Sequence, residues 1–293
     1  MKKYTVYKND LMYKKHRKIN KENIQFDDAE TENMLNMDLD TLEYRFSAAR
    51  SSNFCNLDLK NLDLTEMPII PTDIKKHIKH LFIGDNMLTS IPDLTEYINL
   101  ETLEMSHNKI SIIGSLPTKL IEINCSFNNI KQLPLHTKLQ RLDCHNNELT
   151  HIPLYPELEI LICSNNKLVE LPHIKSLKKL ICDNNNISSV PEFRKVKYLS
   201  ISNNNILTLP KLPKVTDLIC NNMSKPLIFS EMGKIKNLEL FNTKVSALQY
   251  YSTLQEIYCS KDTISTISEA YKLKNIQLHK EHYLIISFDC VQK

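Results

Sequence analysis

The chain has 293 residues, of which 24% are charged, and a formal net charge of +3. This length allows a large hydrophobic core, and the small net charge predicts no general affinity for nucleic acid. With only 3 Gly, a glycine-rich phosphate-binding loop is not expected, and Asn must take the turn positions that need a positive φ.

The N-terminal residues 1–35 are charged and show no periodic pattern, so we interpret them as a flexible arm. Its basic run KKHRK (residues 14–18) could serve nuclear import or phosphate binding, but a solvated arm is the favoured interpretation. A secretory signal would require an apolar segment after the basic start, and none follows. A membrane span would require a run of about 18 apolar residues, and the sequence contains none. We therefore expect a cytoplasmic protein, or a nuclear one, whose eight Cys are reduced thiols.

Residues 36–52 are predicted to form a capping helix, because four apolar residues recur on one helical face. These are Leu39, Leu42, Phe46 and Ala49. A cap is needed because the open end of a repeat protein exposes its core.

Residues 53–293 are built from repeats. Five consecutive segments each begin 19 residues after the last and share the pattern L-x-x-L-x-C-x-x-N-x-L-x-x-L-P. They are LIEINCSFNNIKQLP from Leu120, LQRLDCHNNELTHIP from Leu139, LEILICSNNKLVELP from Leu158, LKKLICDNNNISSVP from Leu177 and VKYLSISNNNILTLP from Val196. The same register continues in units from Phe54, Ile78, Leu100, Val215, Ile235 and Leu254, and in a decayed copy from Leu273. The sequence therefore predicts about twelve units.

The sixth position of the unit decides how the cysteines are interpreted. It holds Cys in six units, and Leu, Ile or Met in the others. A position that accepts these four residue types is apolar, and a buried Cys behaves as a small hydrophobic residue. One thiol per strand also lacks the closely spaced pairs of a zinc site. We therefore expect core thiols and neither a metal nor a cofactor.

The ninth position holds Asn in seven units: Asn86, Asn108, Asn128, Asn147, Asn166, Asn185 and Asn204. The side-chain amide can satisfy backbone groups of the turn and of the neighbouring unit, and Asn tolerates turn conformations. Later units hold Met223, Thr243, Asp262 and Glu281 at this position, so we expect them to have lost the asparagine ladder. The short return path, which ends in Pro, should be extended or 3₁₀, with no helix longer than one turn.

These repeats resemble the leucine-rich repeat, whose signature L-x-x-L-x-L-x-x-N/C-x-L recurs in nearly every unit. The short unit ending in Leu-Pro is similar to the subclass found in bacterial effectors. The resemblance implies a solenoid with a curved parallel sheet on its concave side, an extended or 3₁₀ convex side and little α-helix. The bias toward Asn, Ile and Lys would suit a giant DNA virus or an AT-rich protist.

Side chains at the third, fifth and seventh positions should point out of the concave face of this sheet. Apolar residues there are unexpected on a solvated surface and suggest a protein-binding site. The candidate partner-binding residues are Ile160, Ile162, Ile181, Tyr198, Ile219, Asp143 and Arg141. Later units add Glu239, Phe241, Glu256 and Tyr258 to the same face.

No nucleophile, acid–base pair or phosphate loop stands out, and the ten His are scattered. We therefore interpret the chain as a non-enzymatic, monomeric module that binds a protein partner through its concave face. The alternative is an adaptor that recruits a host or ubiquitination complex through residues 1–50. A catalytic effector is disfavoured, because no separate catalytic domain accompanies the repeats.

Overall fold

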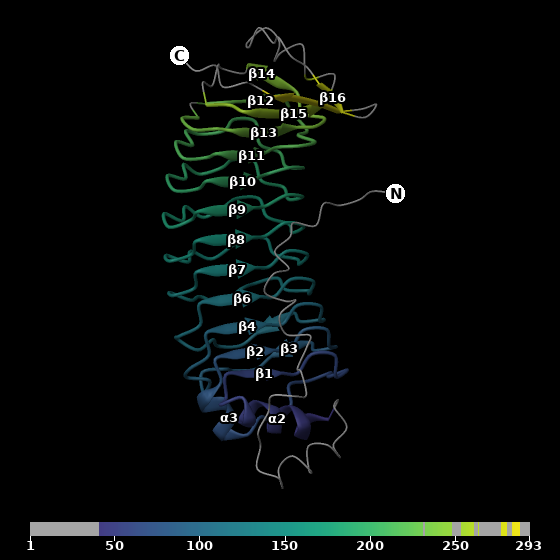
Figure 1. Cartoon of the computed structure of the whole chain (residues 1–293), viewed down its shortest axis with the longest axis vertical. Coiled ribbons are helices and arrows are strands. Elements are labelled where there is room, and N and C mark those ends of the chain that lie inside the picture. The colour runs from purple at the N-terminus through teal and green to yellow at the C-terminus, as the bar shows by residue number, and fades with distance from the viewer. Residues whose placement is uncertain are drawn as a thin grey trace.

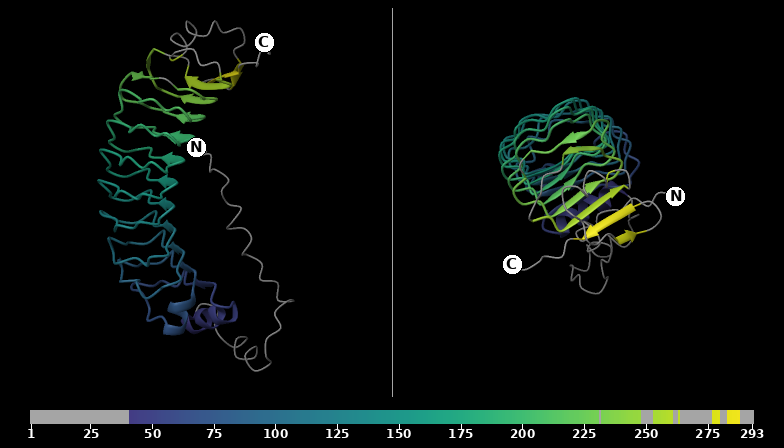
Figure 2. Two further views of the ribbon diagram at one scale, coloured as in Figure 1. Left: turned by 90° about the vertical axis from the view of Figure 1, so that its left-hand side faces the viewer. Right: turned by 90° about the horizontal axis from the view of Figure 1, so that it is seen from above.

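The computed structural model describes residues 41–230, 232–247, 253–260, 263, 277–279 and 283–287. They form a curved stack of short strands, with the strands on the inner side of the arc and the return segments on the outer side (Figures 1 and 2). The predicted solenoid is therefore confirmed. None of the helices in the described part of the chain has the length and hydropathy needed to cross a membrane.

The main sheet of the described residues has 13 strands. Each repeat contributes one strand, which covers the third to fifth positions of the unit. The parallel strands are β1 (Asn56–Asp58), β2 (His80–Phe82), β4 (Thr102–Glu104), β6 (Glu122–Asn124), β7 (Arg141–Asp143), β8 (Ile160–Ile162), β9 (Lys179–Ile181), β10 (Tyr198–Ser200), β11 (Asp217–Ile219), β13 (Asn237–Leu240) and β15 (Glu256–Ser260). Neighbours pair in register, for example Leu142 with Leu161, so equivalent positions of the units form continuous rows.

The N-terminal end of the stack is closed by α2 (Leu42–Ser51). Thr41 caps this helix by accepting a hydrogen bond from the Tyr44 N–H at 3.2 Å. Leu42 and Phe46 pack against the core and Ala49 is buried, as the sequence predicted. The expected start at residue 36, Leu39 and the arm 1–35 lie outside the described residues.

The outer side is mostly extended, with two short strand pairs. These are β3 (Ser90–Ile91) with β5 (Ile112–Ile113), and β12 (Leu227–Ile228) with β14 (Val245–Ala247). The expectation that no helix exceeds one turn was wrong for the first unit, where α3 spans Thr72–His77. That unit starts at Phe54 and the next at Ile78, so it is five residues longer than the 19-residue units that begin at Leu120. The extra length provides room for the helix.

The core includes the first, fourth, sixth and eleventh positions of the units, together with apolar residues of the return segments. The cysteines at the sixth position, including Cys125, Cys144, Cys163 and Cys182, are fully buried free thiols. Burial raises the pKa of each of these thiols well above its ordinary value. The interpretation of these cysteines as core residues is thus confirmed.

The asparagine ladder is also confirmed. The side-chain amide of Asn147 donates to the carbonyls of Cys125 at 2.9 Å and Cys144 at 3.1 Å, and its oxygen accepts from the Ile130 N–H at 2.9 Å. One amide therefore joins two successive units and satisfies three buried backbone groups. Equivalent bonds recur at Asn86, Asn108, Asn128, Asn166, Asn185 and Asn204.

The sequence analysis expected the turn conformation at the ninth position, and this was wrong. The residue with positive φ is the eighth of each unit, one before the ladder residue. It is Asn61, Asn146, Asn165, Asn184, Asn203, Asn222 or Asn242 in seven units, and Asp85, His107 or Phe127 in three others. Asn is common here because its short polar side chain tolerates the left-handed conformation.

Two of the later units keep the ladder with another residue type, contrary to expectation. The buried Thr243 hydroxyl donates to the Cys220 carbonyl at 2.6 Å and accepts from the Met223 N–H at 3.2 Å. In the next unit Thr263, one residue beyond the expected Asp262, donates to the Thr243 carbonyl at 3.1 Å. A hydroxyl can thus replace the amide, at the ninth position in the case of Thr243 and one residue later in the case of Thr263.

The parallel stack ends at β15. The sequence predicted a further unit from Leu273, but the neighbour of β15 is the antiparallel strand β17 (Tyr283–Ser287), which pairs in turn with β16 (Gln277–His279). The prediction of a closing strand in the C-terminal tail is confirmed by β17. An antiparallel hairpin therefore follows the last parallel unit in place of a twelfth repeat.

Candidate interaction surface on the concave sheet

Two rows of side chains face the inner side of the arc. Row three contains the third residue of each unit and row five contains the fifth. From β6 to β15, row three reads Glu122, Arg141, Ile160, Lys179, Tyr198, Asp217, Asn237 and Glu256. Row five reads Asn124, Asp143, Ile162, Ile181, Ser200, Ile219, Glu239 and Tyr258. The residue between the two rows points into the core on every strand.

The first units neutralise their concave charges internally. Lys60 Nζ lies 2.7 Å from the Glu104 carboxylate, which is 2% exposed, although β2 separates their strands. Gly84 lies between them, and a Cβ at that position would come within 2.6 Å of the Glu104 carboxylate. The glycine therefore provides the space through which this ion pair forms. Glu104 also accepts bonds from the Ser106 N–H and hydroxyl.

Two predicted site residues are engaged within the chain. The Arg141 guanidinium lies 2.9 Å from the Glu122 carboxylate in row three. The Asp143 carboxylate lies 2.5 Å from His145 Nδ1 in the same unit. Both residues belong to β7, next to the predicted apolar patch on β8. A partner would meet Arg141 as one half of an ion pair and Asp143 as a carboxylate already in contact with an imidazole.

The predicted apolar residues are brought together on β8 to β11, and Ile162 pairs with Ile181 in row five. All five, namely Ile160, Ile162, Ile181, Tyr198 and Ile219, are half-buried. Two residues that the sequence analysis did not single out interrupt the patch: Lys179 in row three and the buried Ser200 in row five. The Lys179 ammonium lies over the Tyr198 ring, 5.0 Å from its centroid. Burial, and then the charge of Arg141, lower the pKa of Lys179.

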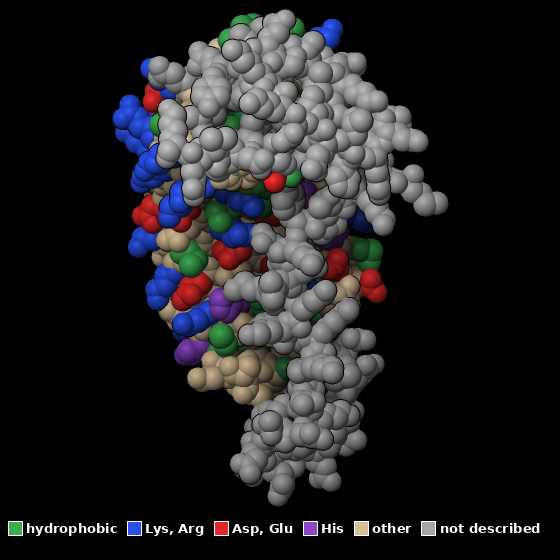
Figure 3. All heavy atoms as spheres, turned by 45° about the horizontal axis from the view of Figure 1, so that its top comes forward, with side chains coloured by type: hydrophobic (Ala, Val, Ile, Leu, Met, Phe, Trp, Pro, Cys, Tyr) green, Lys and Arg blue, Asp and Glu red, His purple; other side chains and the backbone are tan. Residues whose placement is uncertain are grey.

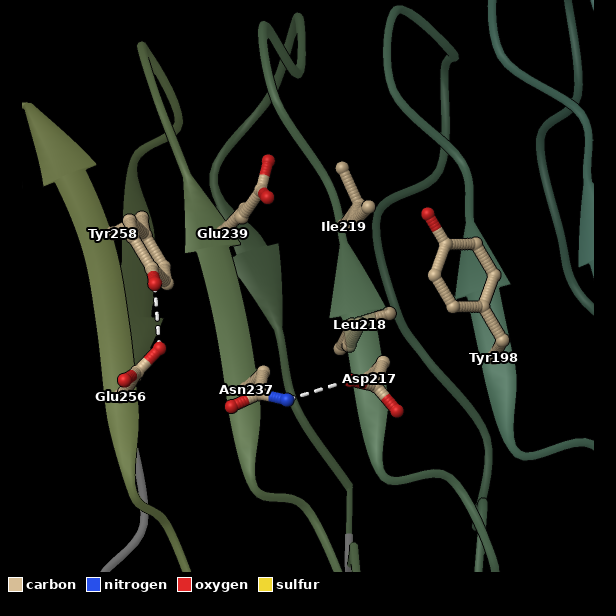
Figure 4. A pocket seen from close by; sticks show the side chains of 8 residues that line it. All are labelled: Tyr198, Asp217, Leu218, Ile219, Asn237, Glu239, Glu256 and Tyr258. Atoms are coloured by element: carbon tan, nitrogen blue, oxygen red, sulfur yellow. Dashed lines mark hydrogen bonds between the residues drawn. The ribbon is translucent and has the colours of Figure 1, made fainter. Parts of the chain in front are cut away.

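A pocket of about 230 Å³ opens at the C-terminal side of this patch (Figure 4). It is lined by Tyr198, Asp217, Leu218, Ile219, Asn237, Glu239, Glu256 and Tyr258. Tyr198 and Tyr258 stand at its two ends, Asp217, Glu239 and Ile219 lie between them, and Glu256 lies beside Tyr258 on the same strand (Figure 4). Strands β10, β11, β13 and β15 supply these residues.

The carboxylates of the pocket bond to neutral groups. The Asn237 amide donates to Asp217 Oδ1 at 2.6 Å, the Asn221 amide donates to Glu239 Oε2 at 3.2 Å, and the Tyr258 hydroxyl donates to Glu256 Oε2 at 2.5 Å. The bond to Glu256, followed by partial burial, raises the pKa of Tyr258 to about 12. Tyr258 is therefore a neutral hydrogen-bond donor at physiological pH.

A further acidic residue was missed by the sequence analysis. Asp183, at the seventh position of its unit, accepts bonds from the Ser200 hydroxyl at 2.7 Å and the Ser202 N–H at 2.7 Å. Burial raises its pKa above the ordinary value, although these bonds oppose the shift. The seventh position was recognised as outward-facing, but the serines that surround Asp183 come from the next strand and its turn.

Outside the concave rows, the described surface includes exposed ion pairs. Lys and Arg side chains alternate with Asp and Glu side chains along one side of the stack (Figure 3), and exposed pairs such as Lys178 with Glu159 lie 2.7 Å apart. Within the residues that the structure describes, no group of three or more His, Cys, Asp or Glu is arranged to hold a metal ion.

Comparison with known proteins agrees with this architecture. The family described as Leucine Rich Repeat matches residues 99–118. Lumican of Rattus norvegicus is 29% identical over 89 residues, and lumican of Gallus gallus is 31% identical over 84 residues. These matches cover 27% and 25% of this chain, and the chain spans only about a quarter of either relative, 25% and 24%.

Two solved structures share the fold. YopM, a leucine-rich effector protein from Yersinia pestis, superposes with a TM-score of 0.57 at 24% identity over 73% of each chain. The APL1 leucine-rich repeat domain superposes with a TM-score of 0.53 at 18% identity, covering 80% of this chain and 83% of its own. The repeat register, the asparagine ladder and these matches together show that the chain has the solenoid fold of leucine-rich-repeat proteins.

Proposed function

We propose that the chain is a non-enzymatic module that binds a segment of a protein partner on its concave face, between β8 and β15. Leucine-rich-repeat solenoids are typical scaffolds for protein–protein interaction, and their curvature offers an extended inner surface. The observation that carries the proposal is the contiguous pair Ile162 and Ile181 in row five, beside the pocket that Tyr198 and Ile219 help to line. Half-buried apolar side chains beside a polar cavity are a common form of protein-binding site.

The rigidity of the surface also supports this function. Its side chains are carried by strands that are bonded on both sides, and the turns that follow are held by the asparagine ladder. A surface that is ordered before binding loses little conformational entropy when a partner docks. The main energetic cost of binding then lies in ordering the partner segment.

The test uses Ile162→Asp and Ile181→Asp in the full chain, with Leu161→Asp as the matched control. The first two change outward side chains and should leave the melting temperature nearly unchanged, with a shift in stability of no more than about 0.5 kcal/mol. Leu161 is buried on the same strand, so its carboxylate variant should unfold the repeat. Binding is measured with peptides selected from a displayed dodecapeptide library against the wild-type chain, by fluorescence anisotropy.

Each Ile variant is expected to weaken the selected peptides by tenfold or more, since a carboxylate would be buried against an apolar contact. Peptides that bind both variants as well as wild type would show that the concave patch is not the binding surface. Failure to select any peptide would also count against the proposal. Early melting of both Ile variants would show that these side chains belong to the core.

The alternative adaptor role places recruitment on residues 1–50. Residues 1–40 lie outside the described residues, so the structure offers no observation in favour of that role. Binding of a protein partner on the concave surface is therefore the function that the geometry supports best.

A further inference from the structure

The concave face separates its charges along the stack. On β7 to β9, rows three and five carry Arg141 and Lys179 with one acidic residue, Asp143. On β10 to β15, the same rows carry Asp217, Glu239 and Glu256 and no basic residue. None of the ion pairs in the described part of the chain includes any of these three carboxylates. The pocket therefore has three negative charges that the described residues leave unbalanced.

The hydrogen bonds of the pocket orient these carboxylates but do not saturate them. Asp217 accepts one bond on each oxygen, from the Asn237 amide and from the Thr216 hydroxyl at 2.6 Å. Glu239 and Glu256 each accept a single side-chain bond, from Asn221 and Tyr258. A carboxylate offers about four acceptor positions on its two oxygens. Capacity therefore remains for a donor that enters from the partner.

The walls of the pocket suit a flat cation. Tyr198 and Tyr258 stand at opposite ends, with Ile219 between them (Figure 4). The Tyr198 ring already has a cation, the Lys179 ammonium, at 5.0 Å from its centroid. Aromatic faces attract cations through the negative potential of their π systems, and a guanidinium can stack on them as well. The aromatic walls and the carboxylates thus favour the same class of ligand.

We propose that this pocket receives an arginine side chain from the partner segment that crosses the concave face. The proposal rests on the proposed function and specifies the chemistry of its ligand. A guanidinium has five donors in one plane and is more weakly hydrated than an ammonium, so it fits a site with spaced acceptors between two rings. The neighbouring Ile162 and Ile181 would contact apolar residues of the same segment. A basic residue flanked by apolar ones is therefore the expected pattern in the partner.

The experiment compares two fluorescein-labelled dodecapeptide libraries on the full chain. Both are randomised without Lys or Arg at every position except the sixth, which is arginine in one library and the neutral isostere citrulline in the other. Binding is measured to wild type, to Glu239→Gln and to the double variant Asp217→Asn/Glu239→Gln. The matched control is Glu157→Gln, which makes the same charge change at an exposed turn residue before β8.

We expect wild type and Glu157→Gln to retain at least tenfold more of the arginine library than of the citrulline library. This preference should fall severalfold in Glu239→Gln and vanish in the double variant, and it should weaken as salt is raised. Equal retention of both libraries by wild type would overturn the arginine proposal. In that case, the effect of Ile162→Asp decides the proposed interaction function. If Ile162→Asp weakens the binding of peptides from both libraries, the interaction function stands. If it does not, the interaction function fails together with the arginine proposal.

One other occupant must be distinguished, because the chain has its own basic run at residues 14–18. A full-length variant with serine at these five positions provides the test. If this variant binds the arginine library and wild type does not, the pocket is filled by the chain's own segment, and the proposal of a partner's arginine is wrong. Equal binding by both chains agrees with the proposal.

Discussion

Replacing Asn166 with Ala removes one rung of the ladder that holds successive units together. The Asn166 amide donates to the carbonyls of Cys144 at 3.0 Å, Cys163 at 3.1 Å and Ser164 at 3.2 Å, and its oxygen accepts from the Leu149 N–H at 2.9 Å. Because the amide has two hydrogens, these contacts amount to two donated bonds and one accepted bond. Their loss affects the contact between two units as well as the turn of one.

The cost follows from counting these bonds. At about 1 kcal/mol for each net hydrogen bond, the change destabilises the chain by about 3 kcal/mol. The N–H of the buried Leu149 would lose its partner, so the upper part of the range is expected. For a protein of this size, 3 kcal/mol corresponds to a drop in melting temperature of roughly 6–12 °C.

Thermal and urea unfolding of wild type, Asn166→Ala and Asn166→Asp measure the effect. Asp has the same shape but directs a carboxylate at three carbonyl oxygens, so at neutral pH Asn166→Asp should be less stable than Asn166→Ala. Thr243 offers a matched comparison, since Thr243→Val removes one donated and one accepted bond and should cost about 2 kcal/mol. Thr243→Ser keeps the hydroxyl and should cost less than Thr243→Val. A loss below about 1 kcal/mol for Asn166→Ala, or equal stability of its Ala and Asp variants, would refute the ladder as a source of stability.

Three further predictions concern buried groups. Burial raises the pKa of Asp183, so wild type should lose stability as the pH rises from the ordinary Asp range through the raised pKa. Asp183→Asn should lose less stability over the same pH interval, as measured by urea unfolding at each pH. Parallel curves of stability against pH for the two proteins would contradict this. Gly84→Ala should cost about 1–3 kcal/mol, because the new Cβ displaces the buried Glu104 carboxylate; if Glu104→Ala does not reduce that cost in the double variant, the clash is not its cause. Among the described cysteines, only the exposed Cys55 should react with Ellman's reagent in the native chain, and the buried thiols should react after unfolding. The measurement uses a variant with Cys290 replaced by Ser. Rapid reaction of any other thiol in the native protein would show that the core opens.

The stack of strands could be predicted from the sequence because every unit repeats the same pattern of apolar residues. Apolar residues at the fourth and sixth positions can be buried only against the next unit, and equal spacing places equivalent residues side by side. Cys144 and Asn147 could therefore be assigned to the core and to the ladder from their positions alone. The candidate residues Ile162 and Ile181 were found in the same way, since alternation along a strand decides which side chains face outward.

Other features depend on contacts that spacing does not encode. The position with positive φ and the use of Thr263 in place of Asp262 depend on which backbone groups each turn must satisfy. An aspartate among carbonyl oxygens would be repelled, whereas a hydroxyl can donate to them, so the shifted unit places the threonine there.

The composition of the concave surface was decided by tertiary structure. The position of a residue in the repeat indicates whether its side chain lies on the concave face. The neighbours of that side chain come from other units, and the length of the side chain determines which of their charges it can contact. Lys60 thus neutralises Glu104 from two strands away, and Arg141 is paired with Glu122. Asp217 in row three and Glu239 in row five face outward as well, but the described residues that bond to them are neutral. Position in the repeat therefore predicted which residues line the surface, whereas only the packed neighbours decided where its charge remains unbalanced, because charge pairing depends on distances between units.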